Sequence, residues 1–81
     1  MTKAQFTQYI AAILTTALDT EPGPFPESMA YLAMGSDINA WNTVKSALAT
    51  AGLATFAGHS LALTDKGREL ARQCNAALAA R

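Results

Sequence analysis

The sequence predicts a small, mainly helical domain that carries one β-hairpin, in the order helix, helix, helix, hairpin, helix. Apolar residues recur three and four positions apart in four segments, which is the period of an amphipathic helix. Glycines and prolines separate these segments, and late in the chain two short apolar stretches flank a glycine, as in a hairpin. A chain of 81 residues holds one core, so a single domain is expected over residues 1–81.

Residues 2–18 are predicted to form the first helix. Thr2 and Gln5 have the spacing of a capping box, in which each side chain pairs with a free backbone N–H of the first turn. Six apolar residues at helical spacing then form the inward face: Phe6, Ile10, Ile13, Leu14, Ala17 and Leu18. Two prolines and a glycine make residues 19–24 a loop.

Pro26 is predicted to take the first position of a short second helix, where no N–H donor is needed. Gly35 is expected to end this helix in the left-handed conformation. Phe25 lies between two prolines and is expected to be extended, either beside the hairpin or as a staple for the second helix. The helix is expected to turn three side chains inward: Met29, Leu32 and Ala33.

Ser36 or Asp37 is predicted to cap a third helix that ends at Gly52. The link between the second and third helices is only two or three residues long, which forces a sharp angle, as in a helix-turn-helix. Trp41 is expected to anchor the third helix against the first, the alternative being an exposed aromatic at a protein interface. The inward stripe consists of Ile38, Trp41, Val44, Leu48 and Ala51.

Residues 53–56 and 61–63 are the predicted strands, with Gly58 in the turn between them. Leu61 and Leu63 alternate inward, and Thr64 caps a fourth helix that runs to about residue 80. The apolar face of this helix consists of Leu70, Cys74, Ala77 and Leu78. Three helices followed by a hairpin and a further helix form the plan of a winged helix-turn-helix, in which the hairpin is the wing.

Two stretches carry a resemblance to a known family: AGLA at residues 51–54 and LALTDKGREL at residues 61–70. They resemble the corresponding run in winged-helix regulators of the multiple-antibiotic-resistance type. The likeness covers roughly residues 26–72. In that family the Gly-Leu pair ends the recognition helix, and the Leu-Thr run closes the wing and opens the next helix. The resemblance implies a DNA-binding fold and a role in transcription regulation.

The outward face of the third helix supplies the candidate DNA contacts: Asn39, Asn42, Thr43, Lys45, Ser46 and Thr50. Asparagine can bind adenine through two hydrogen bonds, and Ser or Thr can pair with several base edges. Lys45 could contact a phosphate or a guanine. His59 at the wing tip is a further candidate for a phosphate or minor-groove contact, and its alternative role is that of a turn residue. Double-stranded DNA is therefore the first candidate partner.

The charge pattern favours a second hypothesis. Six Lys and Arg balance six Asp and Glu, so the formal net charge is zero. Residues 19–37 hold four carboxylates and no basic residue, and residues 54–63 hold no Lys or Arg. Because contact with phosphates requires cations, the alternative is a winged helix that contacts a protein partner or a second copy without binding DNA. A basic stripe over the third helix and the wing would favour DNA, whereas an exposed apolar patch would favour protein contact.

The sequence predicts no catalytic residues, no metal site and no cofactor. It contains one His and one Cys, and it lacks a glycine-rich phosphate loop. Cys74 is expected to be a small buried hydrophobe, and an unpaired cysteine is typical of a reducing cytoplasm. No stretch reaches the roughly 18 consecutive apolar residues that cross a bilayer. We therefore expect a cytoplasmic protein without a membrane partner, as a monomer or a dimer.

Overall fold

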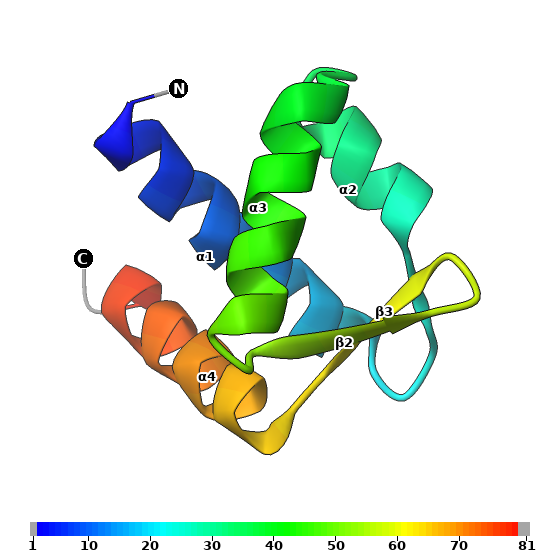
Figure 1. Ribbon diagram of the computed structural model, residues 1–81. Helices are drawn as coiled ribbons and strands as arrows, with labels where there is room; N and C mark the ends of the chain where they lie inside the picture. The colour runs from blue at the N-terminus through cyan, green and yellow to red at the C-terminus, as the bar shows by residue number, and fades with distance from the viewer. Residues whose placement is uncertain (1, 80–81) are drawn as a thin grey trace.

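The computed structural model describes residues 2–79, within which the chain forms four helices and a three-stranded antiparallel sheet (Figure 1). The elements are α1 (Lys3–Thr20), β1 (Phe25–Pro26), α2 (Glu27–Ala33), α3 (Ile38–Thr50), β2 (Ala54–Ala57), β3 (Ser60–Leu63) and α4 (Asp65–Ala79). The predicted fold class is confirmed, and the short strand β1 is an addition to it.

The capping box at the start of α1 is confirmed. The Gln5 backbone N–H donates to Thr2 Oγ1 at 3.1 Å, and the Thr2 N–H donates to Gln5 Oε1 at 2.9 Å. The helix runs two residues beyond the predicted end and stops at Glu21, which precedes a proline and is extended. Its buried face consists of Ile13, Leu14 and Ala17.

The proline-flanked Phe25 is the third strand of the sheet, so the first of its two predicted roles is confirmed. In the strand order β1-β3-β2, Phe25 pairs with Leu61 and Pro26 pairs with Ser60. The Phe25 side chain is buried. Pro26 is extended and occupies the N-cap position rather than the first helical position, because its backbone still belongs to the strand. This pairing fixes the direction in which α2 leaves the sheet.

The predicted inward face of α2 is wrong. Met29 and Leu32 have 54% and 64% of their surface exposed, and Ala33 is exposed as well. Ala30 and, just after the helix, Met34 are buried instead. Apolar residues surround this seven-residue helix on several sides, so periodicity could not select a face. The connection to β1 sets the rotation of the helix instead.

The link from α2 to α3 spans residues 34–37, somewhat longer than predicted. Gly35 and Ser36 both have left-handed backbones, with φ of 74° and 59°, and together they reverse the chain. Of the two predicted caps, Asp37 is the one used, since its Oδ1 accepts from the Ala40 N–H at 3.1 Å.

The buried face of α3 consists of Trp41, Val44 and Leu48. Ile38 and Ala51 were also predicted to face inward, but both are exposed, because they lie at the two ends of the helix, beyond the core. The Trp41 ring meets the Phe56 ring edge-on, with centroids 6.2 Å apart and planes at 69°. Trp41 is therefore a core residue, as predicted, and its ring ties α3 to the hairpin.

Helix α4 packs along α1 with a different face from the one predicted. Gly67 and Ala71 are fully enclosed, Leu70 and Cys74 are half-buried, and Ala77 is exposed. The side chain of Leu78 lies outside the part of the chain whose side chains are described. The close approach occurs at Gly67, where a Cβ would overlap the backbone carbonyl of Leu53. Small residues set the distance between α4 and its neighbours. A prediction from the spacing of large apolar residues does not identify them as part of the buried face.

We predict that Gly67→Ala destabilises the fold although Ala is the better helix former. Ala gains about 1 kcal/mol in helix propensity, but the overlap with the Leu53 carbonyl requires a backbone shift that costs about 1–3 kcal/mol or more. Urea unfolding should show a net loss. Gln73→Ala on the exposed side of α4 is the control and should change stability by less than about 0.5 kcal/mol. An unchanged midpoint for Gly67→Ala would contradict the close packing.

Candidate functional site

The structure brings most of the predicted DNA-contact residues onto one solvent-facing side of α3. Because Trp41, Val44 and Leu48 point into the core, the opposite side of the helix is left exposed. The exposed polar residues on it are Asn39, Asn42, Thr43, Ser46 and Thr50. The Thr43 hydroxyl donates to the backbone carbonyl of Asn39 at 3.0 Å, so that it is available to a ligand mainly as an acceptor. The two asparagine amides lie one turn apart and are the strongest hydrogen-bonding groups of this face.

Lys45 lies at the border of this face and is already engaged. Its Nζ is 2.7 Å from Glu27 Oε1, and it lies 5.1 Å from the centroid of the Phe56 ring. The Lys45 side chain is 37% exposed, whereas that of Glu27 is 16% exposed. Lys45 thus connects the start of α2, the middle of α3 and the hairpin. A phosphate that recruits Lys45 has to compete with Glu27.

His59 occupies the tip of the hairpin, next to the start of α2. Gly58 and His59 form the turn with φ of 57° and 62°, the left-handed pair of a type I′ hairpin turn. The His59 carbonyl accepts from the Glu27 N–H at 2.9 Å, while the residue itself is exposed. In Figure 1 the hairpin projects sideways from the lower end of α3. His59 is therefore a turn residue, which was the alternative role predicted for it. Its imidazole ring is exposed at the tip of the hairpin.

The surface of α3 and the hairpin is nearly free of charge. Residues 38–64 contain no Asp or Glu, and Lys45 is their one Lys or Arg. The Lys66 ammonium donates to the Ala51 carbonyl at 3.0 Å and thereby caps the C-terminus of α3. Across the described part of these elements there is therefore no basic stripe and no carboxylate.

The remaining cations of α4 are paired within the chain. Arg68 Nε is 3.0 Å from Glu21 Oε1, and its Nη1 is 2.9 Å from Asp65 Oδ1. Arg72 pairs with Glu69 at 3.1 Å. Exposed pairs of this kind stabilise a fold by at most about 1 kcal/mol each. Their main consequence is that α4 presents alternating charges rather than a cationic face.

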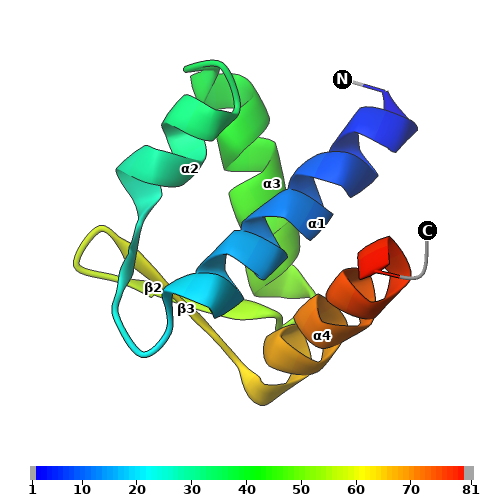
Figure 2. The same ribbon diagram turned by 180° about the vertical axis from the view of Figure 1, so that it is seen from behind.

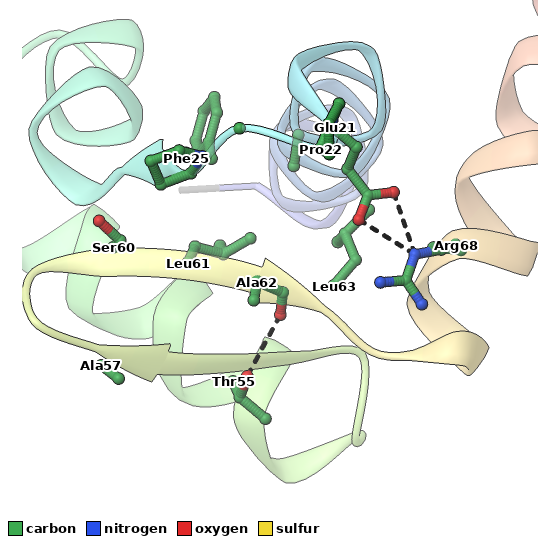
Figure 3. Close-up of a pocket in the computed structure, with 13 residues that line it drawn as sticks. Glu21, Pro22, Phe25, Thr55, Ala57, Ser60, Leu61, Ala62, Leu63 and Arg68 are labelled. Atoms are coloured by element: carbon green, nitrogen blue, oxygen red, sulfur yellow. Dashed lines mark hydrogen bonds and ion pairs between the residues drawn. The ribbon is translucent and has the colours of Figure 1, made fainter.

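A groove of about 380 Å³ lies between residues 21–25 and the hairpin (Figure 3). Phe25 and Leu61 form its apolar walls, and the ion pair of Glu21 with Arg68 closes one end. Sequence reasoning missed this pair, because its members are far apart in the chain and no spacing rule connects them. The two charged groups of the groove are bound to each other, and no group of three or more metal-ligating side chains occurs among the described residues.

A second surface stands out by its hydrophobicity. Three large apolar side chains are more than half exposed: Met29 and Leu32 on α2, and Ile38 at the start of α3. All three were predicted to be core residues. Their exposure leaves apolar side chains at the surface of α2 and at the start of α3, where Ile38 directly precedes Asn39.

No protein-family model, curated protein or solved structure matches the chain. Across residues 2–79, the helices lack an apolar stretch of membrane-spanning length. Two surfaces are therefore the candidates for function: the polar face of α3 and the apolar surface of α2.

Because the Lys45–Glu27 pair is partly exposed, we predict that Glu27→Gln lowers the unfolding free energy by only about 0.2–1 kcal/mol. The loss should be largest at low ionic strength and should shrink at about 1 M salt, where the Debye length is about 3 Å. Urea unfolding at the two salt concentrations measures it. Glu69→Gln, which removes the more exposed pair with Arg72, is the control and should have a smaller effect. A loss that is equally large at both salt concentrations would show that Glu27 acts through packing instead.

Proposed function

We propose that this chain is a small winged-helix protein that binds duplex DNA, of the kind that regulates transcription. The observation that carries the proposal is the solvent face of α3, on which Asn39, Asn42, Thr43 and Ser46 offer hydrogen-bonding groups with no carboxylate among them. The resemblance of residues 61–70 to winged-helix regulators of the multiple-antibiotic-resistance type supports it. The order of helices and hairpin agrees with such a fold.

In this proposal α3 lies in the major groove and reads base edges. In helix-turn-helix proteins the N-terminal residues of the recognition helix contact the bases. Asn39 and Asn42 occupy that part of α3, and an asparagine amide binds the N6 and N7 atoms of adenine together. Ser46 and Thr50, further along the helix, are suited to phosphate or base contacts. His59 at the hairpin tip would meet the backbone or the minor groove beside it.

The charge distribution sets how such binding depends on salt. Non-specific affinity comes mostly from phosphates that are neutralised by Lys and Arg. Among the described residues, Lys45 and Lys66 are the two cations near the α3 face. Lys45 has to break its ion pair with Glu27 before it can bind a phosphate. The proposal therefore requires weak non-specific binding, with most of the specific affinity arising from the α3 side chains.

We predict binding to a mixed-sequence duplex with a Kd of about 10⁻⁴ M at low salt, at the weak end of the usual range. The slope of log K against log salt should be about −1 to −2, because one or two phosphates are neutralised. Electrophoretic mobility shift and fluorescence anisotropy across a salt series measure both quantities. Lys45→Gln should reduce the slope by about 1, whereas Lys3→Gln at the start of α1 should leave it unchanged.

Sequence preference gives an independent test. After selection of a preferred site from a randomised duplex pool, Asn42→Ala should weaken specific binding about tenfold or more and leave mixed-sequence binding unchanged. Asn75→Ala on the exposed side of α4 is the matched control. Absence of any binding at about 20 mM salt, or equal losses for the two alanine variants, would refute the proposal.

Protein contact without DNA binding is the second candidate function. The specific observation in its favour is the exposure of Met29, Leu32 and Ile38. Large apolar side chains that are grouped on a surface mark sites of association more often than isolated ones do. Met29 and Leu32 lie on α2, outside the α3 face, so variants at these two positions test this function separately from DNA binding.

A further inference from the structure

The apolar surface of α2 adjoins a pocket between α1 and α2. Its walls include Tyr9, Ile13 and Thr16 from α1 and Met29, Ala30 and Ala33 from α2. Figure 2 looks onto these two helices, with α3 behind them. Ile13 and Ala30 are buried and form the floor, whereas Met29 and Ala33 are exposed at the rim. The pocket volume is about 140 Å³, and none of the residues that line it is charged.

The size and lining of this pocket suit one apolar side chain. A cavity of roughly 150 Å³ lined by apolar side chains takes up a benzene-sized molecule. Met29 at the rim has a flexible, polarisable side chain that can adjust to different occupants. Leu32, one turn further along α2, extends the apolar surface beyond the pocket. Two helices with a hydrophobic groove between them form the usual receptor for an amphipathic helix.

Charge decides between the possible occupants. Between Lys3 and Lys45 the chain has four carboxylates and no Lys or Arg, and every residue that lines the pocket falls in this stretch. Glu21 and Glu27 are neutralised by ion pairs within the chain. Asp19 has no ion-pair partner among the described residues and lies one turn beyond Thr16 on α1, whereas the Asp37 carboxylate caps α3. A partner with cationic residues beside its apolar side chains is complementary to this surface.

A second copy of the chain is less suitable for the same reason. A two-fold symmetric contact brings the same patch of both copies together, so that Asp19 of one copy would meet a patch whose lining has no Lys or Arg on the other. Like charges that face each other across an interface oppose association.

We propose that the groove between α1 and α2 docks a basic amphipathic helix of a partner protein, with one apolar side chain inserted between Ile13 and Met29. The proposal deepens the second candidate function and is independent of DNA binding. Apolar burial in the pocket supplies the affinity, and Asp19 at the end of α1 favours a cationic helix over an anionic one.

The test uses the full chain and two synthetic helices of about five turns with the same leucine positions. One has lysine at its polar positions, and the other has glutamate. We expect the lysine helix to bind with a Kd in the micromolar range and to shift the backbone amide NMR signals of Met29, Ala33 and Tyr9. The glutamate helix should bind at least about tenfold more weakly.

Variants of the chain locate the site. Ala33→Phe fills the pocket from its rim and should weaken binding of the lysine helix about tenfold. Ala76→Phe introduces the same side chain at an exposed position of α4 and should leave the affinity unchanged. Asp19→Asn should weaken binding about two- to fivefold at low salt.

Several results would overturn the inference. Equal affinity for the lysine and glutamate helices would remove the charge argument, and equal losses for the two phenylalanine variants would place binding elsewhere. If the Met29 and Ala33 signals shift with protein concentration alone, the occupant is a second copy. In that case the second candidate function survives while the cationic partner is refuted. If neither helix nor a second copy perturbs these signals, both are refuted.

Discussion

The junction between the end of α3 and the start of α4 is the constraint on which the arrangement of the hairpin depends. The Thr64 hydroxyl donates to the Gly52 carbonyl at 2.6 Å and accepts from the Gly67 N–H at 3.1 Å. The Thr64 N–H donates to the Leu53 carbonyl at 3.0 Å, the same carbonyl against which Gly67 packs. One threonine therefore caps α4 and closes the base of the hairpin. Because the hairpin base is fixed at both ends, Phe56 is held against Trp41, and the polar side of α3 is held outward.

The features that the sequence predicts correctly are those that depend on residues close together in the chain. The capping box of Thr2 and the cap by Thr64 each join residues three positions apart, and the burial of Trp41 follows from the helical period of the apolar residues in α3. The extended backbone at Phe25 follows from its flanking prolines, although its pairing with Leu61 was only one of two predicted roles. Local chemistry of this kind is decided before the tertiary structure forms, so it can be deduced from spacing.

Contacts between distant segments were not predictable in the same way. The rotation of α2 about its own axis depends on the pairing of β1 with β3. Apolar residues lie on several sides of this short helix, so the sequence did not indicate which side would be buried. The ion pairs of Lys45 with Glu27 and of Arg68 with Glu21 join residues that are far apart in the chain. No spacing rule predicts which charged residues of different elements will meet. The same limit applies to the candidate site, because part of it depends on contacts between distant segments. The residues of the α3 face were identified correctly as outward, but the engagement of Lys45 and the apolar surface of α2 came from the tertiary structure alone.

Ion pairs within the chain limit how much electrostatic attraction either candidate surface can contribute to binding. Three of the five Lys and Arg residues described are bound to carboxylates of the same chain, and Lys66 is bound to a helix end. Long-range attraction to a polyanion is therefore small, so the DNA recognition that we propose would have to arise from hydrogen bonds to bases. In the proposed docking at α2, burial of hydrocarbon is not screened by salt, whereas the attraction between Asp19 and a cationic helix is weakened by it. The two surfaces thus differ in the main origin of their affinity, which is hydrogen bonding to bases at α3 and burial of hydrocarbon at α2.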